Sequence, residues 1–266
     1  MNRILLQVEY DGTNYAGWQR QINGLAVQQV LEETLSSVCG HRVKVTGSSR
    51  TDAGVHAHGQ MVHFDTSARI PAERYPFALN NLLPPDIRVL SGRPVPDGFH
   101  ARFLACGKKY TYRILNSRHG SALMRFDHYH VPVPLDDAAM ARAASALIGE
   151  HDFAAFQASG GTAKTTIRTI HDVQLTRRTD EIIITVAGNA FLYNMVRIIA
   201  GTLVEIGHGK KDEDAFLKAF ATRNRLALGM TAPACGLELT EVYYPAEAFI
   251  APDNIRWHED DTECCD

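Results

Sequence analysis

An acid and a base lie two residues apart in a short polar loop, and they are the first candidates for chemistry. Arg50 and Asp52 belong to residues 48–54, which also hold three hydroxyl side chains and a glycine able to adopt positive φ. An aspartate at such a position often forms an Asx-turn with nearby backbone N–H groups. Beside an arginine and an apolar floor, the same carboxylate could be an ionised nucleophile or a general base. The residues that could form this floor are Val55, Val62 and Phe64.

The loop continues into a long motif. Residues 50–64 read RTDAGVHAHGQMVHF, which resembles the G-R-T-D-A-G-V-H-x-x-G-Q-V-x-H-F signature of the TruA family of tRNA pseudouridine synthases. The resemblance implies that Asp52 is the catalytic aspartate and that Arg50 is the base-flipping arginine. Ser49 stands where the family has glycine, and we expect this difference to stiffen the loop.

A second loop, residues 11–21, is rich in glycine and carries two aromatic side chains. Its composition alone indicates a surface loop whose aromatic residues pack down. However, the run DGTNYAGWQRQ also resembles the first motif of the TruA family. We therefore predict that Arg20 and Gln21 bind substrate.

Residues 107–114 alternate in the manner of a strand, with Tyr110 and Tyr112 on one face. The other face is basic and could simply be solvated. An exposed aromatic ring can also stack on an extruded base, while lysines contact phosphates. The run F-H-A-R-F-x-A-x-x-K-x-Y-x-Y resembles a family motif and implies that Tyr110 is the active-site tyrosine. We predict phosphate contacts for Lys108 and Lys109.

Arg197 lies inside the most apolar predicted helix, residues 191–206. A guanidinium in such surroundings requires a partner, which could be Glu205 or another acid. A pair with Asp52 would instead keep that carboxylate ionised. The run N-A-F-L-Y-N-M-V-R-x-I-x-G resembles the family's third motif, whose arginine pairs with the catalytic aspartate. Further predicted substrate-binding residues are Lys164, Arg168, Gly236 and Leu237.

Periodicity indicates a mixture of strands and helices. Strands are expected at residues 4–10, 42–46, 60–65, 87–96, 107–114, 166–177, 181–187 and 237–244, and helices at 27–38, 71–83, 135–149, 191–206 and 212–222. Residues 1–105 form a half with the Asp52 loop, 106–246 form a second half, and 247–266 form an acidic tail that we expect to be disordered. The resemblance implies an α+β fold. Its two similar α/β halves would join around a mixed, mainly antiparallel sheet with a central active-site cleft.

Composition limits the class of protein. The 266 residues carry a net charge of −3, but residues 252–266 contribute −5, so the remainder sums to +2. An RNA site must then be a local positive patch. The absence of a long apolar run or signal sequence predicts a protein without a membrane span. Five cysteines without Cys-x-x-Cys spacing argue against a disulfide framework or zinc site and favour the cytoplasm.

Two alternatives remain beside an RNA-modifying isomerase. A metal-dependent hydrolase could use His56, His58 and His63 with Asp65, which have ligand-like spacing. A protein that only binds RNA would need no catalytic group. The isomerase requires no cofactor, and no dinucleotide or P-loop motif is present. The family resemblance further implies a homodimer that acts on positions 38, 39 and 40 in the anticodon stem-loop of tRNA.

Overall fold

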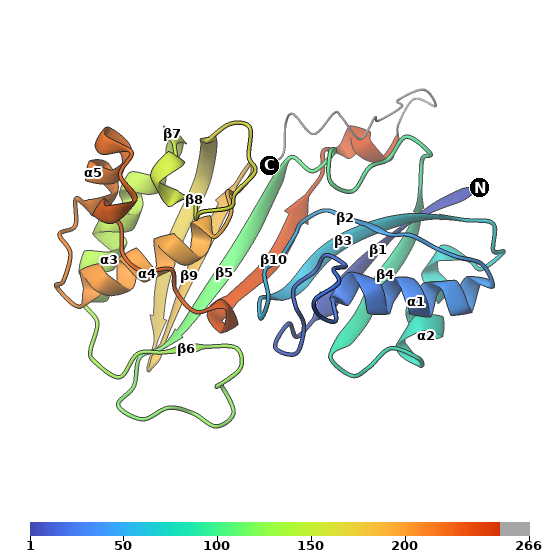
Figure 1. The fold of residues 1–266 in the computed structure, drawn as a ribbon, viewed down its shortest axis with the longest axis horizontal. Coiled ribbons are helices and arrows are strands. Elements are labelled where there is room, and N and C mark those ends of the chain that lie inside the picture. The colour runs from blue at the N-terminus through green and yellow to red at the C-terminus, as the bar shows by residue number, and fades with distance from the viewer. Residues whose placement is uncertain (251–266) are drawn as a thin grey trace. The chain divides into compact units, whose positions relative to one another are not determined.

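The computed structural model of the chain describes residues 1–250, in which strands and helices are mixed (Figure 1). The chain divides into two compact units. Among the described residues, unit 1 is Met1–Cys106 together with residues 239–250, and unit 2 is Gly107–Glu238. The α+β class expected from the sequence is confirmed. The expected second half ran to residue 246, whereas the segment from Leu239 is grouped with unit 1.

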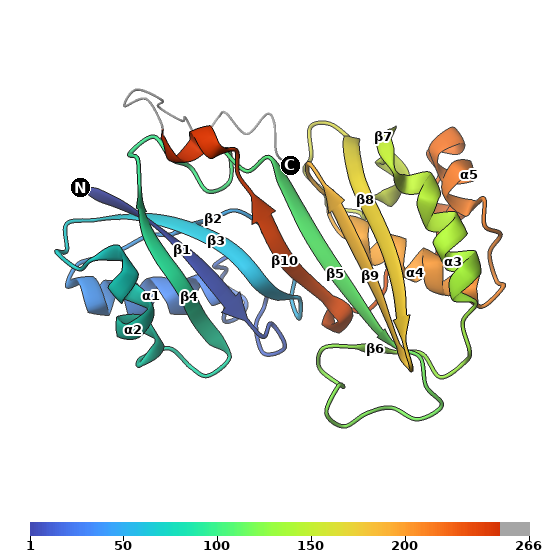
Figure 2. The same cartoon turned by 180° about the vertical axis from the view of Figure 1, so that it is seen from behind.

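Unit 1 is built on an antiparallel sheet with the strand order β4-β1-β3-β10. The central strand β1 pairs with β3 and β4, and Leu6 lies opposite Val62 on one side and Gly92 on the other. Helices α1 and α2 lie in front of this sheet in Figure 1 and behind it in Figure 2. The bounds are β1 Asn2–Tyr10, β3 His56–Thr66, β4 Ile87–Val95, β10 Leu237–Tyr243, α1 Val27–Cys39 and α2 Tyr75–Asn80.

Helix α1 follows its apolar spacing, with Val27, Leu31 and Leu35 buried, and it ends at Gly40 with φ of 71°. The strand expected at 42–46 is wrong for most of its length. Only Thr46–Gly47 pair with β3, as the two-residue strand β2. The preceding backbone donors bind helix side chains instead of a strand. The N–H of Val43 donates to Ser36 Oγ at 2.9 Å, and that of Val45 donates to Glu32 Oε1 at 3.1 Å.

In unit 2 the antiparallel strands follow the order β5-β9-β8-β7, with the short strand β6 parallel to β5. Helix α4 contacts α3, β5 and the short helix after Phe153, and nearly all of its side chains are buried. The bounds are β5 Gly107–Leu115, β6 Tyr129–His130, β7 Gly149–Asp152, β8 Ile167–Arg178, β9 Glu181–Gly188, α3 Asp137–Ala144, α4 Met195–Gly207 and α5 Ala215–Thr222.

Several helices are shorter than expected. The helix predicted from residue 191 begins at Met195, because Asn194 takes the left-handed conformation with φ of 61°. The helix predicted at 71–83 is a 3-10 turn, Ala72–Arg74, followed by α2. The one predicted at 135–149 likewise ends as a 3-10 turn, Ser145–Leu147, and Gly149 then adopts a φ of 111°.

The first residues of the tail expected at 247–266 are ordered. Ala246–Phe249 form a 3-10 helix, in which Ala248 is buried. The ring of Phe249 stacks on Phe99 with centroids 5.6 Å apart, and Arg93 lies 3.6 Å from its centroid. These contacts hold the segment because they bury an aromatic ring. The rest of the predicted tail, residues 251–266, lies outside the described residues.

Across residues 1–250, every helix is too short or too polar to serve as a transmembrane segment.

Candidate active site

The loop that carries Arg50 and Asp52 joins β2 to β3 in unit 1. Its hydroxyl residues are buried, while the Arg50 side chain is exposed and Asp52 is half-buried. The buried amide of Gln60 contacts the start of the loop. Its Oε1 accepts from Ser48 Oγ at 2.8 Å and from the Ser49 N–H at 3.2 Å, while its Nε2 donates to Ser49 O at 2.8 Å.

Thr51 is held from both its side chain and its backbone. Its Oγ1 lies 2.7 Å from the Tyr10 hydroxyl, and its carbonyl accepts from the Trp18 N–H at 3.0 Å. The two aromatic rings stack on each other, with centroids 5.9 Å apart. The glycine-rich loop of residues 11–21 therefore packs directly on the Asp52 loop. Its composition alone had also indicated a loop whose aromatic residues pack down.

Gly17 allows this close approach. Its φ is +93°, and a Cβ built on it would lie 2.6 Å from the Thr51 carbonyl oxygen. Any larger residue would therefore be strained and would push against the Asp52 loop.

The second half of the loop closes as a turn. The Val55 N–H donates to Asp52 O at 3.1 Å, and Gly54 has the positive φ that its type predicted, 76°. Ser49 needs no such conformation, because the positive-φ residues other than glycine in residues 1–250 are Thr179, Asn194 and Arg223. A serine at position 49 is thus compatible with this backbone.

Arg20 and Gln21 make contacts within unit 1. The Arg20 guanidinium lies 3.4 Å from Glu32 Oε2 and 3.6 Å from Glu33 Oε1. Two carboxylates so close reduce its attraction for a phosphate. Gln21 is exposed and donates to the Ala16 carbonyl. Their predicted role in substrate binding remains a prediction.

Tyr110, Lys108 and Lys109 lie on β5 of unit 2. The ring of Tyr110 is buried and forms a T-shaped contact with the ring of Phe191, with the centroids 5.0 Å apart. Lys108 is only 8% exposed, and Thr111 on the predicted basic face is also buried. The second face of the strand is therefore less solvated than its alternation predicted.

Arg197 lies in the first turn of α4 and holds the segment that leads to β10. Its Nε donates to Ala232 O at 2.8 Å, its carbonyl accepts the Ala232 N–H at 3.0 Å, and its Nη1 donates to Asn194 Oδ1 at 2.8 Å. Nearby, burial raises the pKa of the Cys235 thiol, and Arg197 partly opposes this shift. Glu205, the other partner considered for Arg197, accepts from the Met230 N–H at 2.9 Å.

The remaining predicted residues have structural contacts within unit 2. A Cβ on Gly236 would lie 2.7 Å from the Tyr112 ring, and Leu237 is buried at the start of β10. Arg168 is buried, and its Nη1 donates to Ile167 O at 2.7 Å and to Thr165 Oγ1 at 3.1 Å. Lys164 is exposed on the loop before β8.

Comparison with known proteins decides the family. A family model described as tRNA pseudouridine synthase matches residues 6–104 and 143–245 of the chain. This chain belongs to the tRNA pseudouridine synthase family. The matched segments include Arg50, Asp52 and Arg197, whereas Tyr110 lies between them.

Curated relatives agree over nearly the whole chain. The tRNA pseudouridine synthase A of Ruminiclostridium cellulolyticum is 51% identical over 245 residues, which cover 92% of this chain and 100% of the relative. The protein of the same name from Acetivibrio thermocellus is 49% identical over 244 residues, with the same coverage. A solved Cbf5-Nop10-Gar1 complex aligns with a TM-score of 0.39 at 11% identity, covering 89% of this chain and 48% of that one. This last similarity is too low to add to the assignment.

The histidines of the metal-hydrolase alternative have separate partners. His56 Nδ1 accepts the Gly12 N–H at 3.1 Å, His58 Nδ1 lies 2.6 Å from Glu9 Oε2, and His63 Nδ1 accepts the Ala101 N–H at 3.1 Å. Residues 1–250 contain no group of three or more His, Cys, Asp or Glu side chains suited to a metal ion. With the family shown, neither the metal-dependent hydrolase nor the non-catalytic RNA-binding protein is supported.

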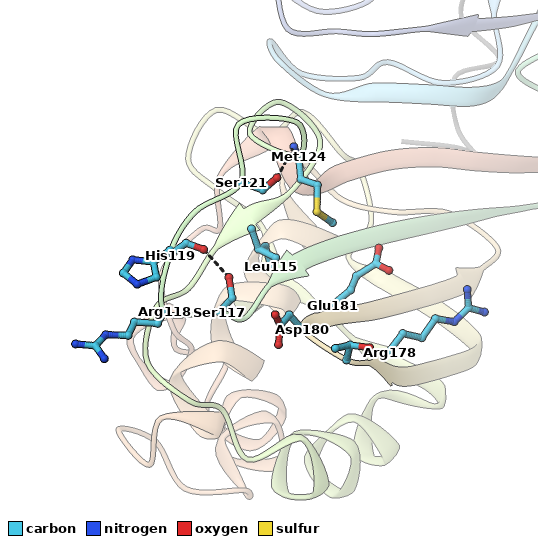
Figure 3. A pocket seen from close by; sticks show the side chains of 10 residues that line it. Leu115, Ser117, Arg118, His119, Ser121, Met124, Arg178, Asp180 and Glu181 are labelled. Atoms are coloured by element: carbon cyan, nitrogen blue, oxygen red, sulfur yellow. Dashed lines mark hydrogen bonds between the residues drawn. The ribbon is translucent and has the colours of Figure 1, made fainter.

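A pocket of about 690 Å³ in unit 2 lies between the loop after β5 and the turn from β8 to β9 (Figure 3). Arg118 and Arg178 extend from it in opposite directions, while Asp180 and Glu181 lie between them. None of the predicted site residues lines this pocket. Arginines that diverge around two acids do not form a convergent anion site, so the pocket is separate from the predicted chemistry.

Proposed function

We propose that this chain converts uridine to pseudouridine in tRNA, with Asp52 as the catalytic group. The reaction breaks the bond between N1 of uracil and C1′ of ribose and forms a bond between C5 and C1′. The C5 proton leaves and N1 gains a proton, so the product is an isomer of the substrate. A carboxylate can serve as nucleophile or as base in such a sequence.

The observation that supports this proposal most directly is the construction of the Asp52 loop. Its backbone and hydroxyl groups are bonded to Gln60, Tyr10 and Trp18 within unit 1, while Arg50 remains exposed. A rigid support lowers the cost of bringing a reactive group to a bound substrate, which is how positioning contributes to catalysis. The family membership indicates which reaction this group performs.

The other roles follow from the family motifs. We propose that Arg50 displaces the target uridine from its helix and that Tyr110 stacks on the extruded base. Arg197 would pair with Asp52 and keep its carboxylate ionised. The substrate would be the anticodon stem-loop of tRNA at positions 38, 39 and 40, bound in the cytoplasm by a homodimer. Phosphate contacts would come from basic residues such as Lys108, Lys109, Lys164 and Arg168.

The test is to incubate the purified protein with unmodified tRNA and to map pseudouridine at single-nucleotide resolution. Modification at positions 38–40 is expected from the wild type, and none from Asp52→Asn, whose affinity for tRNA should persist. Asp65→Asn is the matched control, because Asp65 lies on β3, the strand that follows the Asp52 loop, and forms an ion pair with Arg3 at 2.7 Å. Turnover by Asp52→Asn above a few per cent of wild type, with Asp65→Asn normal, would remove Asp52 from the mechanism.

A further inference from the structure

The side chain of Gln60 is completely buried, with 0% exposure, and all of its hydrogen-bonding contacts in unit 1 go to the first residues of the Asp52 loop. Such an amide has no exposed surface with which to contact RNA. Its effect on the reaction must therefore be transmitted through the loop.

The register of the strands explains what this side chain does. Thr46 lies opposite His63 and Gly47 opposite Val62, and the Ser48 N–H donates to Met61 O at 2.8 Å. The next residue along, Ser49, therefore comes opposite Gln60. Here the side chain of Gln60 contacts the Ser49 N–H and carbonyl, in the way that a strand backbone would.

This substitution of side chain for backbone has a geometric consequence. A glutamine side chain extends beyond the strand backbone, so it can bond to Ser49 after the backbone pairing of β2 with β3 has ended at Gly47. Arg50 and Asp52 follow within three residues. The buried amide accepts from and donates to the backbone of the same residue, Ser49. It therefore fixes the position at which the loop leaves the sheet and leaves Ser49 little freedom to shift along β3.

We propose that Gln60 is a positioning residue for the reaction, whose amide sets where the segment bearing Arg50 and Asp52 leaves the sheet. The inference rests on the proposed role of Asp52. Gln60 does not touch the substrate and performs no proton transfer. It acts through Ser49, and the rate of the chemical step depends on it more than the affinity for tRNA does.

The first variant is Gln60→Leu, which keeps the size and removes every polar contact. We expect kcat to fall about 10²-fold, the usual effect of a displacement of about 1 Å at a reacting group. The KM for tRNA should change little, because phosphate contacts dominate binding. The control is Leu79→Ala, which leaves a cavity at a fully buried position of α2. It should lower the free energy of unfolding and leave kcat unchanged while the protein is folded.

The second variant, Gln60→Glu, separates positioning from simple packing. An ionised carboxylate can accept from the Ser49 N–H but places an oxygen against the Ser49 carbonyl. A protonated carboxyl can donate to that carbonyl as the amide does, and burial favours the protonated form. The ratio of its kcat to that of wild type should therefore rise as pH is lowered. Taking the ratio at each pH cancels the titrations that both proteins share.

The outcomes are distinct. If Gln60→Leu folds and matches the kcat of wild type, or if it loses no more than Leu79→Ala, Gln60 merely fills the core. A ratio for Gln60→Glu that does not vary with pH overturns the proposal even if Gln60→Leu fails to fold. If Asp52→Asn remains active, the proposed function itself fails. If Asp52→Asn is inactive while both Gln60 variants are normal, only the positioning role fails.

Discussion

Tyr110 and Tyr112 lie two residues apart on β5, and both rings are buried. Tyr112 donates its hydroxyl to Pro233 O at 2.8 Å, and burial raises the pKa of this hydroxyl. Tyr110 instead forms a T-shaped ring contact with Phe191. The pair therefore offers a comparison between a tyrosine with a proposed role at the base and one with a role inside unit 2.

If Tyr110 stacks on the extruded base, its ring matters more than its hydroxyl. Tyr110→Phe should then be mild, and Tyr110→Ala should lose roughly 1–3 kcal/mol in kcat/KM or in tRNA affinity. Tyr112→Phe should mainly lower stability through the lost hydrogen bond. Steady-state kinetics and filter binding measure both effects. Equal losses for Tyr110→Phe and Tyr110→Ala would show that stacking is not its role.

At the scale of the element, Gly17 connects the glycine-rich loop to the Asp52 loop. Gly17→Ala should destabilise unit 1 by roughly 1–3 kcal/mol, because it adds both left-handed strain and a contact with the Thr51 carbonyl. Gly40→Ala is the matched control, since Gly40 has φ of +71° but open space around its Cβ position. Urea unfolding gives the stabilities. Turnover should fall for Gly17→Ala alone, and equal turnover in both variants would contradict the coupling.

The strand β3 also contains a histidine whose contribution to the stability of the fold depends on pH. Burial and the neighbouring His100 and Arg3 lower the pKa of His63 to about 3, and its Nδ1 accepts the Ala101 N–H. The folded state keeps this ring neutral, whereas the unfolded chain protonates it near pH 6.5. The neutral His63 ring therefore contributes its full stabilisation of the folded state above pH 6.5, and this contribution is lost as the pH falls toward 3.

Lowering the pH from 8 to 5 should reduce the free energy of unfolding by roughly 2 kcal/mol through His63. His63→Asn keeps an acceptor for Ala101 and removes the titration, so its stability should vary less over this range. Urea titrations at the two pH values measure the difference. A wild type and a variant that lose stability equally would exclude this histidine as the cause.

The same elements show what the sequence could predict. The end of α1 at Gly40 and the positive φ of Gly54 follow from residue type, and the Arg50–Asp52 loop follows from its motif. The expected strand at 42–46 failed because its N–H groups bind Glu32 and Ser36, which no local periodicity encodes.

The missed parts of the site have a similar origin. Gln60 is part of the motif, but its pairing with Ser49 depends on strand register. The hydrogen bond from Arg197 to Ala232 O joins residues that are 35 positions apart in the sequence. Neither contact could be found from composition or spacing, because both depend on which distant segments the tertiary structure brings together.

At the scale of the whole molecule, the proposed pair of Asp52 and Arg197 would join unit 1 to unit 2. Arg197→Lys keeps the charge but loses the planar guanidinium, so it cannot hold Ala232 and a carboxylate in the same geometry. Its activity should fall steeply even if the fold survives.

A double-mutant cycle with Arg197→Met and Asp52→Asn isolates the pair, because the loss of the Ala232 contact is common to both Arg197 variants in the cycle. We expect a coupling of about 0.5–3 kcal/mol in the free energy of unfolding, with the double change less destabilised than the sum. Arg142→Met serves as a control, since Arg142 is exposed and pairs with Glu213. Strict additivity with Asp52→Asn would place Arg197 apart from Asp52.

The residues of unit 2 lie between the two segments of unit 1 in the sequence, and this order affects how unit 1 folds during synthesis on the ribosome. Unit 2 is complete at Glu238, whereas β3 receives its neighbour β10 only when the residues from Leu239 onward have emerged. Gly59 lies where the Thr240 carbonyl approaches, so β3 presents an open edge there until β10 has emerged. A nascent chain would therefore carry the Asp52 loop on an unfinished sheet. We expect it to acquire activity only after β10 has been synthesised, and to need shielding of that edge from other chains until then.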